Sequence, residues 1–221
     1  EHFFDLTGSI SYIVTIIVAY LFHPNMDARS LVVCVLIAIW AIRLGSYLFL
    51  RVKRDGKDRR FDVMKTKFFR YMFTWTMGGA WVFITMAAGL AVITSANQVA
   101  LDGFFYSGVA LWALGFGIEI VADRQKSQFR RNPENKEKFI TEGLWSISRH
   151  PNYFGEIVLW LGIAVIALPT LLGWQYITLI SPIFVTFLLI KVSGVKLLEK
   201  SGMERWGEDP AYGDYVASTP S

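Results

Sequence analysis

Charged residues are scarce in this sequence, and long stretches of it have none. Only 18% of its 221 residues are charged, whereas a soluble domain usually carries about 25%. No charged residue lies between Arg70 and Asp102, or between Glu156 and Lys191. About 20 apolar residues cross a bilayer, so the first stretch can hold one span and the second can hold two short spans. A soluble core of this size would need more polar surface to cover it, and the sequence therefore predicts an integral membrane protein.

Cysteine and histidine are also scarce, and their scarcity excludes several kinds of site. The single cysteine, Cys34, lies inside an apolar run, so a disulfide framework is excluded. The three histidines are scattered along the chain, so we expect no zinc, haem or other metal site. The sequence also lacks a GxGxxG fingerprint, a Walker A motif and a GxSxG elbow. A nucleotide that binds this chain is therefore not expected to use a Rossmann domain.

Apolar segments are abundant, and they predict an all-α fold: a polytopic transmembrane helical bundle. Its spans are expected at about 9–22, 31–50, 71–95, 103–122, 152–168 and 174–190. We expect these spans to form a single transmembrane domain over residues 1–221, with a turn at Pro169 and a kink at Pro182 in the last span. Because the sequence starts at Glu1 and not at a methionine, a seventh span upstream remains open.

The basic residues are concentrated in alternate loops, and this alternation predicts the orientation in the membrane. Residues 51–70 carry nine lysines and arginines and residues 123–149 carry seven, whereas residues 96–102 and 169–175 carry none. Basic loops stay on the cytoplasmic side of a membrane. We therefore expect the two basic loops and the tail 191–221 to face the cytosol, which agrees with six spans.

Polar residues at membrane depth are candidates for a functional site, since burying them in lipid is costly. One group lies at the end of the fourth predicted span and comprises Glu119, Asp123, Lys126 and Arg130. Their spacing of four, three and four residues places them on one face of a helix. They form either a polar wall that reaches a cytosolic anion site or a helix end whose charges pair with one another and extend to the headgroups.

A second group fills residues 143–156, at the mouth of a long apolar segment. Pro151 suits the first turn of a helix, and Asn152 and Glu156 then lie one turn apart on the same face. An amide and a carboxyl group in this arrangement indicate a binding site. The alternative is an interfacial anchor belt made of Arg149, His150 and Tyr153.

Two further groups lie closer to the N-terminus. Arg43 and Tyr47 are four residues apart in the second predicted span, and Arg43 is either functional or reaches the interface along its aliphatic stem. Glu1 and Asp5 precede the first apolar segment. For these carboxylates, a helix start capped by Asp5 or Thr7 is the alternative to a functional role.

Several motifs resemble the steroid 5α-reductase family, and above all its bacterial membrane proteins. The most specific is the run from Ser148 to Glu156, Ser-Arg-His-Pro-Asn-Tyr-Phe-Gly-Glu, which follows Gly-Leu-Trp at 143–145. Further matches are Asp123, Lys126, Phe129 and Arg130, the Arg-Leu-x-x-Tyr-Leu pattern at 43–48 with Asp58, Arg60 and Phe61, and the tail at 209–215. A shorter Arg-His-Pro-x-Tyr-x-Gly form also occurs in sterol reductases and isoprenylcysteine carboxyl methyltransferases.

The resemblance implies an NADPH-dependent oxidoreductase of the 3-oxo-5α-steroid 4-dehydrogenase type, which reduces a carbon–carbon double bond conjugated to a ketone. It implies that NADPH lies in a polar cavity between the later spans, open to the cytosol. The substrate, a 3-oxo-Δ4-steroid or another lipophilic enone, would enter between the earlier spans from the membrane lipid. We expect a bacterial inner-membrane protein with no nucleic-acid partner. The natural substrate and the oligomeric state are not predicted.

The same resemblance implies roles for particular residues. Cofactor binding is expected of Asp123, Lys126, Arg130, Lys138, Trp145, Ser148, Arg149, His150, Asn152, Tyr153, Glu156 and Tyr212. Arg43 and Trp40 are expected to bind the substrate. Family members polarise the ketone oxygen with an acidic residue and a tyrosine from early spans, so the expected catalytic residues are Asp5 or Glu1 with Tyr47. Trp40 is an alternative for the tyrosine position. A carboxyl group that apolar surroundings keep protonated can donate the required hydrogen bond.

Two other functions remain open. An S-adenosylmethionine-dependent methyltransferase of the isoprenylcysteine type shares the Arg-His-Pro-x-Tyr core and a late acidic motif near Glu199. Its methyl donor carries no phosphate, however, so it needs the basic loop 123–149 less. A lipid-binding or transport protein is the other alternative. Transporters tend to show paired repeats and broken helices, and neither is visible in the sequence.

Overall fold

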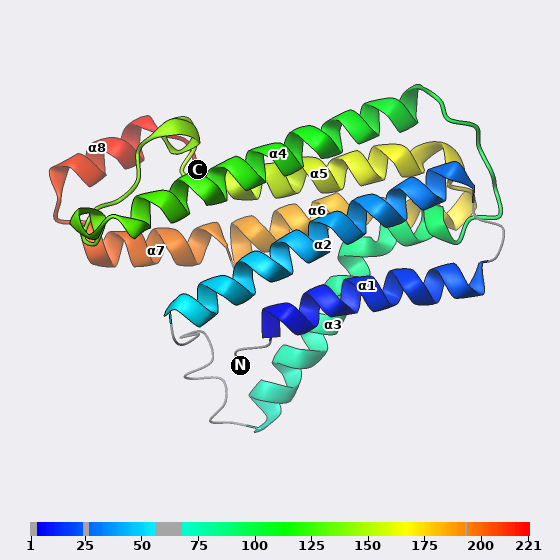
Figure 1. Cartoon of the computed structure of the whole chain (residues 1–221), viewed down its shortest axis with the longest axis horizontal. Helices are drawn as coiled ribbons and strands as arrows, with labels where there is room; N and C mark the ends of the chain where they lie inside the picture. The colour runs from blue at the N-terminus through cyan, green and yellow to red at the C-terminus, as the bar shows by residue number, and fades with distance from the viewer. Residues whose placement is uncertain (1–3, 24–26, 56–67, 193) are drawn as a thin grey trace. The chain divides into compact units, whose positions relative to one another are not determined.

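The chain is helical throughout most of the part that the structure describes. The computed structural model describes residues 4–23, 27–55, 68–192 and 194–221, and no strand occurs among them (Figure 1). The α-helices are α1 (Phe4–Phe22), α2 (Ala28–Asp55), α3 (Phe68–Ile93), α4 (Gly103–Arg131), α5 (Pro151–Ala167), α6 (Ile180–Phe187), α7 (Val195–Trp206) and α8 (Pro210–Ser218). Short 3-10 helices cover Pro133–Asn135, Gly143–Ser146, Leu168–Thr170 and Gly173–Leu179, and a π-helical turn covers Leu188–Val192. The predicted all-α fold is confirmed.

Length and composition identify the helices that cross the membrane. Within the described residues, five segments are long and apolar enough to do so, and a shorter apolar helix precedes them: Ala28–Lys53, Trp75–Ile93, Gly103–Arg131, Pro151–Thr170 and Gly173–Trp206, preceded by Leu6–Phe22. Each predicted span falls on one of these segments, so the predicted transmembrane helical bundle is confirmed. The helix α4 extends past the predicted end of its span at 122, because residues 123–131 contain neither glycine nor proline and are rich in good helix formers.

One expectation about a helix end differs from the structure. The helix α1 is already helical at Phe4, so Asp5 and Thr7 lie within it and neither precedes it as a cap. Pro182 lies in the first turn of α6, directly after a 3-10 segment, and the kink expected there stays a prediction. A π-helical turn follows α6.

Contacts within the chain divide it into two compact units, each built from two stretches of sequence. Unit 1 comprises Glu1–Tyr106 and Ile163–Ser181, and unit 2 comprises Ser107–Gly162 and Pro182–Ser221. The helices α4 and α5 contribute residues to both units. The expectation of a single transmembrane domain therefore stays a prediction.

Unit 1 packs α1, α2 and α3 against one another. The rings of Tyr12 and Trp40 meet edge to face, with their centroids 5.0 Å apart. A Cβ on Gly89 would lie 2.7 Å from Cδ1 of Ile37, so the absence of a side chain at Gly89 leaves room for Ile37 between α3 and α2. Trp40 and Ile37 are consequently 2% and 1% exposed.

A buried arginine joins the start of α2 to two other parts of unit 1. Arg29 has 0% of its surface exposed. Its guanidinium donates to the carbonyl oxygens of Ile166 and Ala100 at 2.8 and 2.7 Å, and to the Asp102 carboxylate at 2.9 Å. It also lies 5.7 Å from the centroid of the Phe105 ring. A buried charge needs such partners, and they fasten the loop before α4 to α2 and α5.

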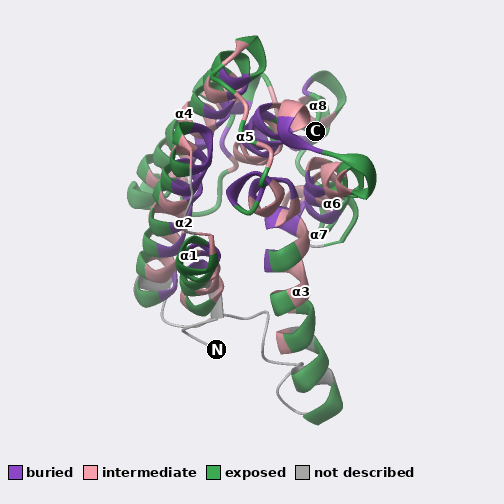
Figure 2. Ribbon diagram, turned by 90° about the vertical axis from the view of Figure 1, so that its right-hand side faces the viewer, coloured by how far each residue is buried: buried purple, intermediate pink, exposed green. Residues whose placement is uncertain are grey.

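In unit 2, α4 and α5 run side by side (Figure 1). A Cβ on Gly155 would lie 2.5 Å from the carbonyl oxygen of Gly115, and a Cβ on Gly162 would lie 2.6 Å from that of Gly108. Small residues at a helix interface let two backbones approach closely in a membrane. Figure 2 shows that α4 has one buried face and one exposed face. The close packing sets the C-terminal part of α4 beside the start of α5, where the predicted polar residues lie.

Candidate functional site

The centre of the candidate site is a polar contact between α4 and α5. Asn152, in the first turn of α5, donates to Oδ1 of Asp123 at 3.3 Å. Asp123 is 4% exposed, and Glu119, one turn earlier on α4, is 2% exposed. Glu156 lies one turn beyond Asn152 and is half-buried. Carboxyl groups are costly to bury, so their concentration at the end of an apolar span indicates a functional site.

The segment after α4 folds back onto that helix. Gly143 adopts a φ of +60°, a conformation that favours glycine. Oε1 of Gln125 accepts a hydrogen bond from the backbone N–H of Leu144 at 3.0 Å. Trp145 donates from Nε1 to the carbonyl oxygen of Ala122 at 3.0 Å and is 3% exposed. These contacts hold the segment that leads into α5 against the polar end of α4.

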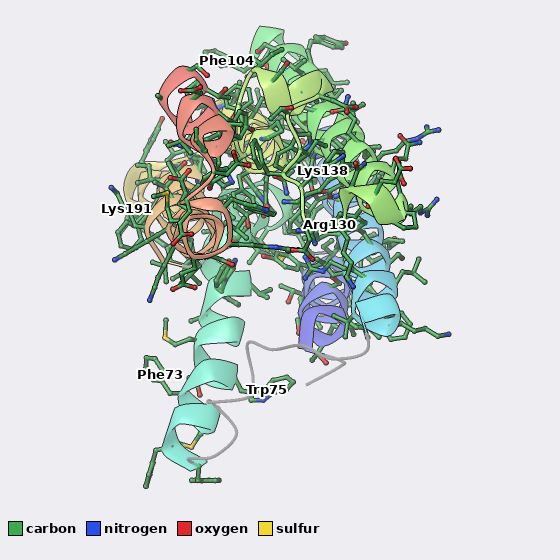
Figure 3. All side chains as sticks on the ribbon, turned by 90° about the vertical axis from the view of Figure 1, so that its left-hand side faces the viewer. Phe73, Trp75, Phe104, Arg130, Lys138 and Lys191 are labelled. Carbon is green, nitrogen blue, oxygen red and sulfur yellow. The ribbon has the colours of Figure 1, made fainter. Side chains whose placement is uncertain are left out.

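Several cationic side chains belong to α4 and to the segment that follows it. The Lys126 ammonium lies 4.4 Å from the centroid of the Trp145 ring. Arg130 and Lys138 are exposed; Figure 3 shows them at the end of α4 and in the loop that follows. The Arg149 side chain is 14% exposed. Arginine and lysine groups of this kind are suited to binding phosphate.

Glu199 of α7 binds two neighbouring residues that precede α5. Its Oε1 atom forms an ion pair with Nη2 of Arg149 and a hydrogen bond with Nε2 of His150, each over 3.1 Å. The His150 side chain is 8% exposed and that of Glu199 is 32% exposed. The backbone N–H of His150 donates to Oγ of Ser148 at 3.2 Å. The His150 ring stacks on that of Tyr153, with 5.7 Å between the centroids.

The C-terminal residues close over the same segment. The backbone N–H of Arg149 donates to the Pro220 carbonyl oxygen at 2.8 Å, and Nη1 of Arg149 donates to the Val216 carbonyl oxygen at 3.3 Å. The Tyr215 hydroxyl donates to the carbonyl oxygen of Trp145 at 2.7 Å. Arg149 is thus held by α7, by α8 and by the residues that follow α8.

Tyr212 lies in an aromatic cluster of unit 2. It is 8% exposed, and its ring centroid is 5.0 Å from that of Phe139 and 5.7 Å from that of Trp206. Its hydroxyl packs against Gly202, where a Cβ would collide with it. The structure therefore gives Tyr212 a packing role, and its predicted contact with a cofactor stays a prediction.

Burial changes the acid–base properties of this region. Burial lowers the pKa of His150, and the nearby Glu199 carboxylate offsets part of this shift. Burial also raises the pKa of Tyr212, and it raises the pKa of Tyr215 to about 12. At neutral pH, His150 is therefore mainly neutral and both tyrosines keep their protons.

The residues expected to bind the cofactor all belong to unit 2. The contacts above join Asp123 to Asn152, Lys126 to Trp145, and Ser148, Arg149, His150 and Tyr153 to one another or to Glu199. Arg130 and Lys138 are exposed, Glu156 is half-buried and Tyr212 is buried. Their roles in binding stay predictions.

The residues expected to bind the substrate or to act in catalysis belong to unit 1. The Arg43 guanidinium lies 5.3 Å from the centroid of the Tyr47 ring, and Trp40 is 2% exposed. Glu1 and the side chain of Asp5 lie outside the described residues, as do Asp58, Arg60 and Phe61 of the family motif. The catalytic pair therefore stays a prediction.

Three residues that hold the site together were not predicted from the sequence as site residues. Glu199 binds Arg149 and His150 across a large separation in sequence, and only the acidic motif shared with methyltransferases points to it. Gln125 contacts a glycine turn that begins well after α4 ends. Tyr215 bonds to a backbone carbonyl, and no side-chain pattern marks such a contact.

The chain is similar to two kinds of reductase and to a methyltransferase. A model of the family described as "Protein of unknown function (DUF1295)" matches residues 1–219. Probable O-methyltransferase ustE of Ustilaginoidea virens is 30% identical over 84 residues, which are 38% of this chain and 30% of that protein. For 3-oxo-5-alpha-steroid 4-dehydrogenase 1 of Bos taurus the identity is 36% over 75 residues, 34% of this chain and 29% of that protein. For Delta(14)-sterol reductase of Neurospora crassa it is 34% over 96 residues, 37% of this chain and 19% of that protein.

These matches cover less than a third of the length of each curated relative. No solved structure matches the chain. The resemblance to the steroid 5α-reductase family is confirmed, since 3-oxo-5-alpha-steroid 4-dehydrogenases of cattle, mouse and rat are among the relatives.

Proposed function

This chain belongs to the DUF1295 family, and we propose that it is a membrane-embedded oxidoreductase that uses NADPH to reduce the carbon–carbon double bond of an enone. The names of two relatives, a 3-oxo-5-alpha-steroid 4-dehydrogenase and a Delta(14)-sterol reductase, support a steroid or another lipophilic enone as the substrate class. Such a substrate partitions into lipid. It would reach the protein from the membrane that its apolar helices are able to cross.

The cationic groups of unit 2 fit the phosphates of NADPH. A pyrophosphate and a 2′-phosphate call for arginine and lysine donors. Arg149 pairs with the Glu199 carboxylate through Nη2 and donates one N–H of Nη1 to the Val216 carbonyl oxygen. Each terminal nitrogen of a guanidinium carries two N–H groups, so Arg149 has further N–H groups that can donate to a phosphate oxygen. The further cationic candidates are Lys126, Arg130 and Lys138.

The amide and carboxyl groups of the site fit the rest of the cofactor. Asn152 has a second amide hydrogen beside the one that it donates to Asp123. Together with Glu156, these residues offer donors and acceptors to ribose hydroxyls or to the nicotinamide amide. In our proposal they orient the dinucleotide, and the cationic groups supply most of the binding energy.

The chemistry that NADPH supplies when bound is hydride transfer. The chain must place the reacting carbon of the enone beside the cofactor and polarise the ketone oxygen. For the second task we propose Asp5 or Glu1 acting with Tyr47, as a protonated carboxyl group and a phenol that donate hydrogen bonds. Arg43, which lies beside the Tyr47 ring, and Trp40 are proposed to bind the substrate.

The observation that carries this proposal is the hydrogen bond between Asn152 and Asp123 in the unit that also holds the Arg149–Glu199 ion pair. An interfacial anchor belt needs no buried carboxyl groups and no amide that bonds to them. Such groups suit the ribose and nicotinamide parts of a dinucleotide, and the cations suit its phosphates.

Replacing Asn152 tests the proposal. We expect Asn152→Ala to weaken NADPH binding about tenfold or more, because it removes the amide and the hydrogen bond that it donates to the buried Asp123 carboxylate. Isothermal titration calorimetry on the full chain in lipid nanodiscs measures the Kd. Asn97→Ala is the matched control, since Asn97 donates to the Thr170 carbonyl oxygen within unit 1, and its Kd should equal that of the wild type. If folded Asn152→Ala binds NADPH as tightly as the wild type, the assignment is wrong.

A methyltransferase is the second candidate function, and the similarity to the O-methyltransferase of Ustilaginoidea virens supports it. The carboxylate and amine of S-adenosylmethionine could bind Arg149 and Glu199, which form an ion pair in the structure. Transfer of tritiated methyl groups, compared with NADPH oxidation on the same preparation, separates the two functions. Methyl transfer without NADPH oxidation would replace the reductase proposal.

A further inference from the structure

One carboxylate oxygen of unit 2 fixes two neighbouring side chains at once. Oε1 of Glu199 forms an ion pair with Nη2 of Arg149 and a hydrogen bond with Nε2 of His150, each over 3.1 Å. Both partners are largely buried, with 14% and 8% of their side chains exposed. Two of their nitrogens, Nε of Arg149 and Nδ1 of His150, are buried and have no hydrogen-bond partner among the described residues.

The contact with Glu199 determines which ring nitrogen of His150 carries the proton. An ionised carboxylate only accepts hydrogen bonds, so Nε2 must be the protonated nitrogen. In the neutral ring, Nδ1 is then an acceptor. Lys126 of α4 and the adjacent Arg149 add positive charge near the ring, and Glu199 of α7 adds the negative charge. Burial lowers the pKa of His150 and favours this neutral form.

The guanidinium of Arg149 is oriented from two sides. Glu199 holds Nη2, and the Val216 carbonyl oxygen holds Nη1 at 3.3 Å. A planar guanidinium that is fixed in this way loses little conformational freedom when it binds an anion. The backbone N–H of His150 donates to Oγ of Ser148, and the His150 ring stacks on the Tyr153 ring.

We propose that Glu199 is a positioning residue, which fixes the Nε2-protonated tautomer of His150 and directs the Arg149 guanidinium at a phosphate group of the dinucleotide. The part that concerns the dinucleotide rests on the proposed function, and the part that concerns the tautomer does not. Orientation of binding groups by a carboxylate behind them is a general device in binding and catalytic sites.

The direction in which NADPH affinity changes when the Glu199 carboxylate is removed distinguishes a positioning role from simple charge neutralisation. NADPH is an anion, so removing a carboxylate near its site raises the local positive potential and strengthens its binding. Losing the orientation of Arg149 weakens binding instead. Weaker binding after removal of a negative charge is therefore the signature of a positioning residue.

Two substitutions at Glu199 and one control measure this sign. We expect Glu199→Ala to raise the Kd for NADPH about tenfold, and Glu199→Gln to raise it less, because the amide oxygen still accepts one hydrogen bond. Glu204→Gln removes the same charge from the same helix at a side chain that is 67% exposed, and its Kd should match the wild type or fall slightly. If both Glu199 variants bind NADPH as tightly as the wild type or more tightly, the positioning role is overturned.

A second measurement needs no cofactor. In full-length chain labelled with 15N-histidine, the wild type should show a proton on Nε2 of His150 that is protected from exchange with solvent. A His150→Gln variant identifies its signals among those of the three histidines. Glu199→Ala should lose this protection and Glu199→Asp should keep part of it. A proton on Nδ1 in the wild type, or full protection in Glu199→Ala, overturns the tautomer assignment.

The two halves of the inference can fail separately. If the wild type binds no NADPH, the proposed function and the dinucleotide half of the inference are both wrong, whereas the tautomer result is unaffected.

Discussion

At the scale of single residues, Tyr215 shows how one hydroxyl can join the C-terminal helix to the site. Its hydrogen bond to the Trp145 carbonyl oxygen is 2.7 Å long, and burial raises its pKa to about 12. In the unfolded chain the tyrosine pKa is about 10. The stability that protonated Tyr215 contributes is therefore complete below pH 10 and is lost as the pH rises from about 10 to about 12.

Tyr215→Phe should lower the free energy of unfolding by about 1 kcal/mol at neutral pH, the usual contribution of one such hydrogen bond. It should also lose less stability than the wild type between about pH 10 and pH 12, since the titrating group is gone. Denaturant unfolding in detergent at several pH values measures both effects. Tyr176→Phe, at a side chain that is 52% exposed, is the control. Equal alkaline losses in Tyr215→Phe and the wild type would contradict this role.

At the scale of secondary-structure elements, the contact between α4 and α5 determines whether the polar groups meet. A Cβ on Gly115 would collide with the Gly155 carbonyl oxygen and lie 2.5 Å from the Leu159 nitrogen. On the same helix, a Cβ on Gly117 would have no atom within 4 Å. Gly115 and Gly117 therefore form a matched pair for testing the helix contact.

Gly115→Ala should destabilise the protein by roughly 1–3 kcal/mol, because the two backbones must separate to admit the methyl group. It should also weaken NADPH binding, since Asp123 and Asn152 would move apart. Gly117→Ala should leave binding unchanged and stabilise the helix by up to about 1 kcal/mol. Thermal unfolding and calorimetry on both variants provide the comparison. Equal behaviour of the two variants would show that the close approach of α4 and α5 is unimportant for the site.

The sequence predicts the helices well because a helix that crosses a membrane must be apolar over about 20 residues. The absence of charge in 71–101 and in 157–190 located spans without any knowledge of packing. The helical spacing of Glu119, Asp123, Lys126 and Arg130 also predicted that the helix continues beyond its apolar span, and α4 does so as far as Arg131.

The site was predictable where its residues are close in sequence. Helical spacing placed Asn152 and Glu156 on one face of α5, and Pro151 marked the start of that helix. The contacts of Glu199 were not predictable in this way, because they depend on how α7 packs beside the segment before α5. Local spacing contains no information about such long-range contacts.

At the scale of the whole molecule, the distribution of basic residues predicts which loops face the cytosol. In a Cys34→Ala background, a cysteine placed at exposed Lys138 should react with a membrane-impermeant maleimide only from the cytosolic side. A cysteine placed at Trp174, which is 81% exposed, should react only from the opposite side. Labelling of intact cells and of inverted vesicles measures the difference. Labelling of both positions from the same side would contradict six spans.

The central claim is that unit 2 binds a phosphorylated dinucleotide, and native mass spectrometry of the full chain tests it most directly. The protein, released from mild detergent after incubation with equal concentrations of NADPH and S-adenosylmethionine, should carry one NADPH molecule. Asn152→Ala should carry NADPH on a clearly smaller fraction of molecules under the same conditions. Wild-type protein that carries S-adenosylmethionine instead, or that carries neither ligand, would contradict the account.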